Sequence, residues 1–191
     1  YGFSLSNVGN LLVTDLRAGS PDGVDTLIET EQAQFNGQTS VLRVGTNAAD
    51  TITVNGGSDL LIGLGGNDTL SAGGGADFLI GGAGNDTLNG GNGTDTALFT
   101  GQVNNYGFSL VGANVVVTDT RGGSPDGADT LNSVETVQFG LQSLDVNAGS
   151  NANNNIDANG GNDLVLGFGG DDELTGGNGA DVLVGGLGAD D

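Results

Sequence analysis

Acidic residues recur in this chain at a fixed interval of nine residues. The first series is Asp50, Asp59, Asp68, Asp77, Asp86 and Asp95, and the second is Asn154, Asp163, Asp172, Asp181 and Asp190. Carboxylate and amide oxygens are ligands that Ca²⁺ prefers, with roughly six to eight oxygens per ion. The chain has no His and no Cys, and these residues are the usual ligands of zinc and copper. The two series therefore predict a set of calcium sites.

Each acidic residue lies in a nine-residue frame, G-G-x-G-x-D-x-U-x, in which U is apolar. Residues 81–89 match this frame at every position. The apolar residues of the successive frames are Ile52, Leu61, Leu70, Leu79, Leu88, Ala97, Ile156, Val165, Leu174 and Leu183. The Gly-rich part of a frame suits a turn, and its last three residues suit a short strand. One such strand cannot bury its apolar residue alone, so we expect the frames to stack.

A coil with two frames per circuit places residues 18 apart on top of each other, at the strand spacing of about 4.8 Å. An ion between two stacked turns would lie about half of that spacing from each turn, within reach of oxygen ligands. Glycine lets such turns bend, so that main-chain carbonyl oxygens can face the ion. We expect these carbonyls near Gly63, Gly65, Gly73, Gly75, Gly82, Gly84, Gly91, Gly93, Gly167, Gly169, Gly177 and Gly179.

Stacked carboxylates repel one another when no cation lies between them. Two unit charges about 5 Å apart repel by roughly 1 to 3.5 kcal/mol at effective dielectric constants of about 80 to 20. Several such pairs approach the roughly 5–15 kcal/mol by which a typical domain is stable. We therefore expect the coiled segments to be unfolded without metal, and calcium binding to supply the free energy of folding.

The frame resembles the hemolysin-type calcium-binding nonapeptide of the RTX (repeat-in-toxin) family, which bacteria export by type I secretion. The resemblance covers residues 45–100 and 149–191. It implies an all-β fold with two short right-handed parallel β-rolls that hold several stacked Ca²⁺ ions. It also implies a secreted, extracellular module that stays unfolded at low cytosolic calcium. Extracellular Ca²⁺ would then fold it, and affinities of about 10⁻⁴–10⁻³ M suffice for that.

A longer repeat of about 104 residues contains both series. The segment VTDLRAGSPDGVDTL at 13–27 returns as VTDTRGGSPDGADTL at 117–131. We divide the chain into a first β interlude (1–44), roll 1 (45–100), a second β interlude (101–148) and roll 2 (149–191). The second copy stops inside its repeats, so we expect the chain to be a segment of a longer protein.

The interludes have the alternating pattern of β-strands. YGFSL occurs at 1–5 and 106–110, and each copy is followed by a Gly/Asn turn and a second apolar run, which predicts an antiparallel hairpin. The segments 26–35 and 130–139 are predicted to be further strands, with a short helical turn as the alternative. Asp22, Asp25, Asp126 and Asp129 are candidates for an extra cation site, although a hydrophilic loop is the simpler interpretation.

The repeats are not equal. Residues 45–53 and 149–157 lack most of the glycines, and Asn154 stands where other frames have Asp. We expect these first turns to cap the rolls and to bind weakly. Asp68, Asp77 and Asp172 each belong to two stacked pairs, so we expect them to matter most.

One outer face of each roll is unusually apolar. In roll 1 this face carries Leu60, Ile62, Phe78 and Ile80, and strands that are apolar on both sides are normally buried on both sides. We expect a hairpin of the interlude to cover it, with an apolar face made of Tyr106, Phe108, Leu110 and Val115–Val117. The alternative cover is another domain or another copy of the parent protein, which would make the module self-associate.

Composition excludes several classes of function. The formal net charge of −21 argues against nucleic acid and anionic membranes as partners, and no apolar run approaches the roughly 20 residues of a membrane span. Without His, Cys or Lys, common nucleophilic mechanisms are excluded. We therefore expect no enzyme here, and any catalytic activity would lie outside residues 1–191.

A structural role is the alternative function. The 104-residue unit would then be an adhesive repeat or an extender, as in a surface or S-layer protein. Ice binding is a minor alternative, since Thr51, Thr69 and Thr87 form a ladder at a spacing of 18 residues.

Overall fold

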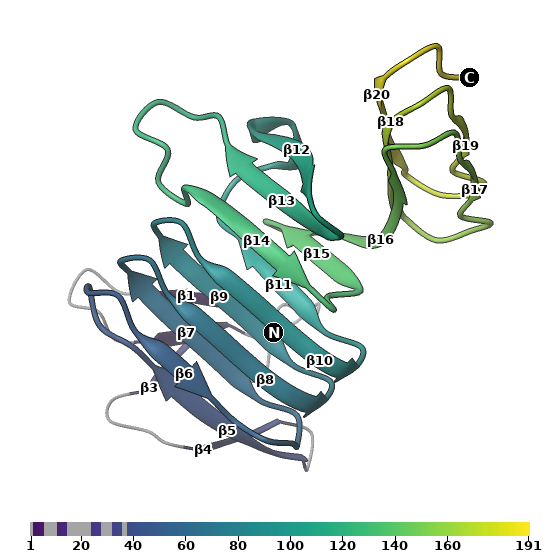
Figure 1. The fold of residues 1–191 in the computed structure, drawn as a ribbon. Coiled ribbons are helices and arrows are strands. Elements are labelled where there is room, and N and C mark those ends of the chain that lie inside the picture. The colour runs from purple at the N-terminus through teal and green to yellow at the C-terminus, as the bar shows by residue number, and fades with distance from the viewer. Residues whose placement is uncertain (1, 6–10, 15–23, 28–31, 36–37) are drawn as a thin grey trace.

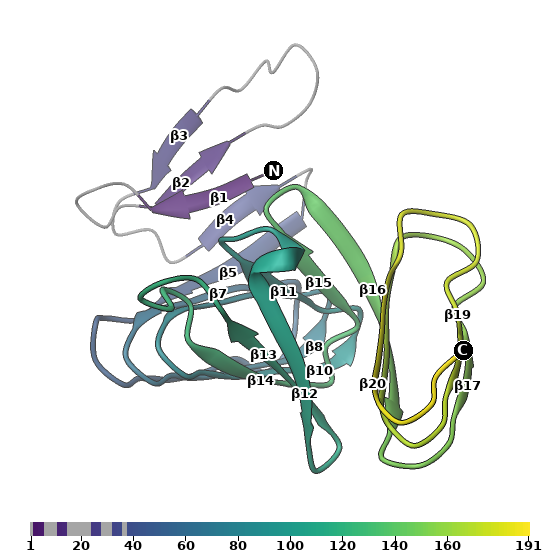
Figure 2. The same ribbon diagram turned by 90° about the horizontal axis from the view of Figure 1, so that it is seen from above.

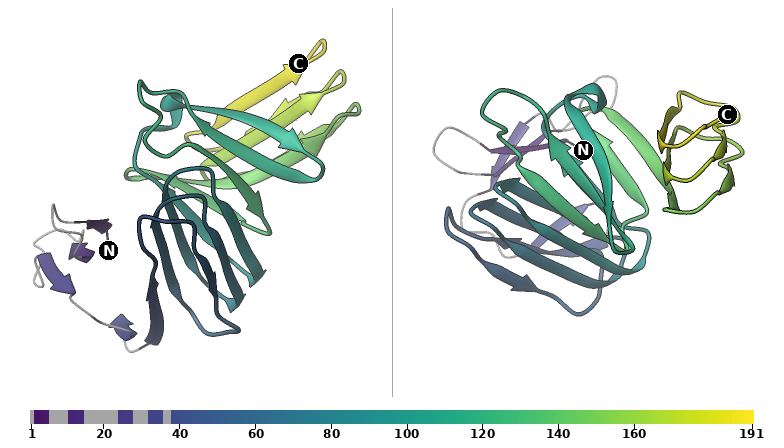
Figure 3. Two further views of the ribbon diagram at one scale, coloured as in Figure 1. Left: turned by 60° about the vertical axis from the view of Figure 1, so that its left-hand side comes forward. Right: turned by 45° about the horizontal axis from the view of Figure 1, so that its top comes forward.

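The computed structural model describes residues 2–5, 11–14, 24–27, 32–35 and 38–191, with side chains from residue 41 onward. Within these ranges the chain is all-β apart from one 3₁₀ turn, η1, at Val103–Asn105. The described part contains no helix that is long and apolar enough to cross a membrane. Strands of the second interlude lie between roll 1 and roll 2 (Figures 1 and 3).

Roll 1 consists of two parallel sheets that face each other. One sheet contains β6 (Thr51–Thr53), β8 (Thr69–Gly75) and β10 (Thr87–Gly93), and the other contains β5 (Gln38–Val44), β7 (Leu60–Gly65), β9 (Phe78–Ala83) and β11 (Thr96–Phe99). Thr51 lies beside Thr69, and Thr69 beside Thr87. The register therefore advances by 18 residues, and the predicted parallel β-roll is confirmed.

The apolar position of each frame forms the core of the roll. Leu61, Leu70, Leu79 and Leu88 have no exposed surface. Each short strand contributes only a few buried apolar side chains, as β8 does with Leu70 and Ala72, so a continuous core arises only when several circuits stack.

Roll 2 repeats this construction. Its parallel strands are β16 (Gln142–Ser150), β18 (Asp163–Gly169) and β20 (Val182–Leu187) on one side, and β17 (Asn155–Asp157) and β19 (Glu173–Thr175) on the other. The circuits of roll 2 lie over one another in Figure 2. Because β16 begins in the second interlude, one nine-stranded sheet runs from β4 (Gln32–Phe35) through both rolls to β20.

Both interludes contain the predicted hairpins. The strands β1 (Gly2–Leu5) and β2 (Leu11–Thr14) are antiparallel, as are β12 (Tyr106–Val111) and β13 (Asn114–Asp119). The strands β3 (Val24–Leu27) and β14 (Ala128–Asn132) continue these two sheets, and β15 (Thr136–Phe139) pairs with β16. The segment 130–139 therefore forms strands rather than a helical turn.

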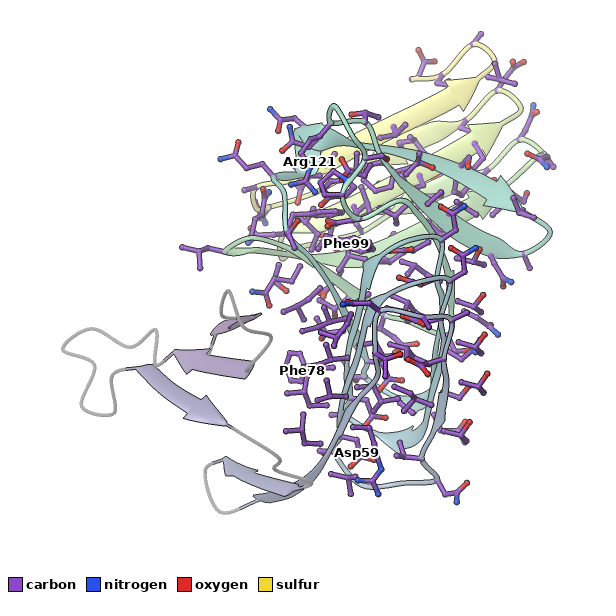
Figure 4. The ribbon with its side chains drawn as sticks, turned by 90° about the vertical axis from the view of Figure 1, so that its left-hand side faces the viewer. Asp59, Phe78, Phe99 and Arg121 are labelled. Atoms are coloured by element: carbon purple, nitrogen blue, oxygen red, sulfur yellow. The ribbon has the colours of Figure 1, made fainter. Side chains whose placement is uncertain are left out.

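The predicted cover of the apolar faces is right for roll 2 and wrong for roll 1. In roll 1, β12 and β13 extend the sheet that contains β10 instead of covering the opposite sheet. Strands β1–β4 lie on the side toward which Phe78 points (Figure 4), where Leu60 and Ile62 are buried. In roll 2, β12 contacts β18, whose Leu164 and Leu166 have no exposed surface. The alternating pattern identifies a strand with an apolar face but not the sheet it will join.

The second interlude contains a cluster of aromatic rings and ion pairs. The ring centroids of Phe99, Tyr106 and Phe139 lie 4.8–5.3 Å apart. Arg121 pairs with Asp119 at 2.7 Å and with Asp126 at 2.9 Å, and the Tyr106 hydroxyl donates to Asp126. The Arg121 guanidinium lowers the pKa of Asp119 to about 2.

The extra cation site suggested by the sequence is not assembled around Asp126, because the carboxylate of Asp126 has these protein partners. Asp22 lies outside the described residues, and Asp25 is described only as part of strand β3.

Candidate metal centre

The acidic residues of both series lie in turns that stack along the rolls. Those that are at most 2% exposed are Asp59, Asp68, Asp77, Asp86, Asp95, Asp163 and Asp172. The other members of the two series, Asp50, Asn154, Asp181 and Asp190, are partly exposed. Burying a carboxylate is unfavourable unless it gains partners. We call the two stacked acidic series the ladder. The partners of its seven buried carboxylates determine whether it can bind cations.

One oxygen of most ladder carboxylates accepts a hydrogen bond from a main-chain amide of the neighbouring circuit. The amide of Asp50 donates to Asp68 Oδ1 at 2.8 Å, and the amide of Asp68 donates to Asp86 Oδ1 at 2.7 Å. The same bond recurs from Asp59 to Asp77, Asp77 to Asp95, Asn154 to Asp172, Asp163 to Asp181 and Asp172 to Asp190. These bonds join residues 18 apart and fix the orientation of each carboxylate.

The second oxygen of the seven buried aspartates has no partner in the described protein. Each Oδ2 atom is buried and accepts no hydrogen bond. A buried carboxylate oxygen without a partner is strongly unfavourable. Since the same atom is left over in seven equivalent turns, the residues fit a row of bound cations that would supply the missing partner.

The unpartnered oxygens face glycines in the same turns. A Cβ added to Gly63 would lie closer than 2.5 Å to both Asp68 Oδ2 and the carbonyl oxygen of Gly81. One added to Gly167 would lie 2.6 Å from the Gly185 carbonyl oxygen and closer still to Asp172 Oδ2. Two oxygens that close to one point are within about 5 Å of each other, so one Ca²⁺ could contact both.

The carbonyls beside the carboxylates are only partly those expected. Gly63 is one of the predicted positions and Gly81 adjoins the predicted Gly82, but no predicted position adjoins Gly185. All three occupy the first position of the frame, which is the signal that could have identified them. The other predicted carbonyls lie in or next to the same turns, and their role stays a prediction.

The first turn of each roll differs from the rest. Asp50 Oδ2 accepts hydrogen bonds from the amide and the hydroxyl of Thr46, at 2.6 and 2.8 Å. Asn154 Oδ1 accepts one from the amide of Ser150 at 2.7 Å. Protein donors therefore satisfy these two oxygens, which agrees with the expectation that the first turns cap the rolls.

The electrostatics of the ladder favour a cation. Burial raises the pKa of Asp77 to about 6, and the neighbouring carboxylates of Asp95 and Asp59 add to the rise. Burial is also the main cause of the raised pKa values of Asp86, Asp95 and Asp163. A raised carboxyl pKa means that the charged form is disfavoured, and a cation beside the group reverses that preference.

Main-chain oxygens must supply much of any coordination shell. No group of three or more acidic side chains surrounds a common point in the part of the chain that the structure describes. Few carboxylates combined with many carbonyls suit a hard cation such as Ca²⁺, which accepts carbonyl oxygens readily.

Three acidic residues outside the regular frames continue the ladder, and of these the sequence had suggested only Asp129 as a cation ligand. Asp129 and Glu135 accept hydrogen bonds from the amides of Asp86 and Asp95, and Asp145 lies beside Asp163 in the parallel sheet. The run Gly127–Leu131 matches the second half of the frame, and this was the available signal for Asp129. Glu135 and Asp145 lie outside any recognisable frame.

Comparison with known proteins adds a family match. The model of the RTX calcium-binding nonapeptide repeat matches four times, over residues 44–79, 62–97, 148–183 and 157–191. No curated protein matches the chain. A solved structure that is similar in part, the extracellular lipase LipA from Serratia marcescens, is 18% identical with a TM-score of 0.26. That alignment covers 79% of this chain and 27% of the lipase, so the chain spans about a quarter of the lipase.

Proposed function

Because this chain belongs to the family of RTX calcium-binding nonapeptide repeat proteins, we propose that it binds several Ca²⁺ ions between turns 18 residues apart and folds only when they are bound. The observation that carries this proposal is the row of seven buried aspartate Oδ2 atoms without a partner. Each ion would supply positive charge to one such oxygen. The proposed side-chain ligands are the acidic series from Asp50 to Asp95 and from Asn154 to Asp190.

At each proposed site, different residues orient the carboxylate and supply the oxygen ligands. The aspartate Oδ1 accepts an amide hydrogen bond from the next circuit, which aims Oδ2 at the turn. The first glycine of the frame has no side chain to crowd Oδ2, and a carbonyl oxygen such as that of Gly81 lies close to the same glycine. We therefore expect both oxygens to be among the ligands of the ion.

Folding and binding are coupled because the roll is poorly stable alone. Its short strands contribute few apolar side chains to the core, and its turns bury carboxylates whose pKa values are raised. A structural metal that binds the folded state but not the unfolded state contributes its binding free energy to folding. The module would thus be unfolded in low calcium and folded in high calcium.

This coupling suits export. We propose that the parent protein leaves a bacterial cell unfolded through type I secretion and folds in extracellular calcium. Catalysis is not assigned to this module, because it has no His, Cys or Lys. Any activity of the parent would lie in other domains.

A structural or adhesive repeat is the second candidate. The continuous nine-stranded sheet from β4 to β20 favours it, because a sheet shared by both rolls makes the 104-residue unit suitable as a stiff spacer. In this case calcium would make the folded repeat stiffer, rather than keep the chain unfolded until it has been exported.

The first test is a calcium titration followed by circular dichroism. In chelator we expect little β structure, and on adding Ca²⁺ a cooperative gain of it. Millimolar Mg²⁺ should substitute poorly, because it requires a tight octahedron and gives up water reluctantly. A β spectrum that is the same in chelator and in calcium would show that the metal is not needed for folding.

A further inference from the structure

The ladder of roll 1 does not stop where the nonapeptides stop. The amide of Asp86 donates to Asp129 Oδ1 at 2.8 Å, and the amide of Asp95 donates to Glu135 Oε2 at 2.9 Å. Both bonds repeat those that join residues 18 apart inside the roll. The strands that follow are also in register, with Leu88 beside Leu131 and Ala97 beside Val137. The second interlude therefore adds one more circuit to roll 1.

This last circuit is built from a different sequence. Asp129 follows Asp86 by 43 residues, because the β12–β13 hairpin is inserted between them. Gly127, at φ +73°, stacks on the carbonyl of Gly84 and leaves no space there for a Cβ. The path from Asp129 to Glu135 is shorter than a nonapeptide. The longer side chain of Glu135 reaches the Asp95 amide across this shortened turn, where a regular frame uses Asp.

The turn that ends in Asp95 faces this circuit. Asp95 has no exposed surface, and its Oδ2 has no partner in the described protein. A Cβ added to Gly90 would lie 2.5 Å from Asp95 Oδ2 and closer still to the carbonyl oxygen of Ser133. Ser133 thus occupies the place that the Gly81 carbonyl takes beside Asp68 Oδ2 within the roll.

The backbone of Ser133 supports this assignment. Its φ is +49°, in the left-handed region that non-glycine residues rarely adopt. In that conformation its carbonyl oxygen lies between the space in front of Gly90 and the amide of Gly91, which donates to it at 3.2 Å. Such outliers persist where the surrounding structure holds them and often mark ligand sites.

We propose that Asp95 and Ser133 form a further Ca²⁺ site at the seam between roll 1 and the second interlude, with Glu135 as the residue that positions Asp95. This closing site uses residues outside the nonapeptides. It rests on the proposed function, since it assumes that the regular turns bind calcium. Its consequence is that calcium fastens the second interlude onto roll 1.

Tyr106 of the second interlude can report whether calcium binds at the closing site. The strands β11 and β15 leave the closing site side by side and end at Phe99 and Phe139, which are paired in the sheet. Both rings contact Tyr106. The chain has two Tyr and no Trp, so Tyr106 becomes the only strong near-ultraviolet chromophore in a Tyr1→Phe background.

The test compares two isosteric variants in that background. Asp95→Asn removes the charge at the closing site, and Asp157→Asn removes one from an exposed side chain of roll 2 outside the acidic series, as the control. The far-ultraviolet signal, the near-ultraviolet signal of Tyr106 and the number of bound ions by equilibrium dialysis are measured against calcium. For Asp95→Asn we expect one ion fewer and a Tyr106 midpoint raised at least about tenfold, while Asp157→Asn leaves the ion count and the Tyr106 midpoint unchanged.

Gly90→Ala is the second variant, because it fills the same space without altering a charge. It should shift the Tyr106 midpoint in the same direction as Asp95→Asn. If the rolls fold with calcium but both variants keep the parent's ion count and Tyr106 midpoint, the closing site is absent although the proposed function stands. If neither signal of the parent responds to calcium, the proposed function itself fails.

Discussion

Asp68→Ala and Asp77→Ala should each raise the calcium concentration at the folding midpoint by about tenfold or more, whereas Asp50→Ala should shift it by less than about threefold. Asp68 and Asp77 lie in the middle of their ladders, bonded to the circuit on each side. Their Oδ2 atoms are buried without a protein partner. Removing either one takes a carboxylate from between two stacked turns.

Asp50 is the matched control because it belongs to the same series. Its Oδ2 is already satisfied by Thr46, and it has a neighbouring circuit on one side only. The three midpoints are compared by circular dichroism at fixed ionic strength, since the strongly acidic chain is sensitive to salt. Equal midpoints for all three variants would mean that the stacking of the ladder does not determine calcium affinity.

Gly63→Ala should abolish calcium-driven folding of roll 1 at calcium concentrations that fold the parent. The added methyl would enter the space shared by Asp68 Oδ2 and the Gly81 carbonyl oxygen. Gly63 does not have a positive φ, so an alanine backbone is acceptable there and the effect arises from the filled space. Gly122→Ala is the control, because a Cβ on Gly122 meets nothing within 4 Å.

A double variant separates loss of the ion from a simple clash. If Gly63→Ala acts by excluding the ion that Asp68 binds, adding Asp68→Ala should change the midpoint little further, because contacting residues of one site are not additive. The readout is the same calcium titration. Fully additive shifts would indicate that the alanine destabilises the turn independently of calcium.

The sequence predicted the regular part of this fold because a strict nine-residue period leaves one stacking register. Once two frames make a circuit, Thr51, Thr69 and Thr87 must be neighbours, and they are. The same period placed the apolar residues such as Leu70 in the core and the aspartates in the turns. The carbonyl positions were harder to predict, since any glycine of a turn could face the ion.

The sequence could not predict where roll 1 ends. The insertion of the β12–β13 hairpin breaks the period, and Glu135 replaces the expected Asp, so the last circuit has no regular signature. The position of the hairpin was missed for a related reason. Its alternating apolar face is compatible with several sheets, and only the pairing of β13 with β14 decides which one it joins.

The most direct measurement is a crystal structure of the calcium-loaded protein with anomalous difference density for the metal. We expect peaks between stacked turns, within coordination distance of the Oδ2 atoms of the seven buried aspartates, including Asp68, Asp77 and Asp172. We also expect a peak between Asp95 and the Ser133 carbonyl. Well-ordered calcium-grown crystals in which these oxygens instead bind water or protein donors, with the ions elsewhere, would contradict calcium binding by the stacked aspartates.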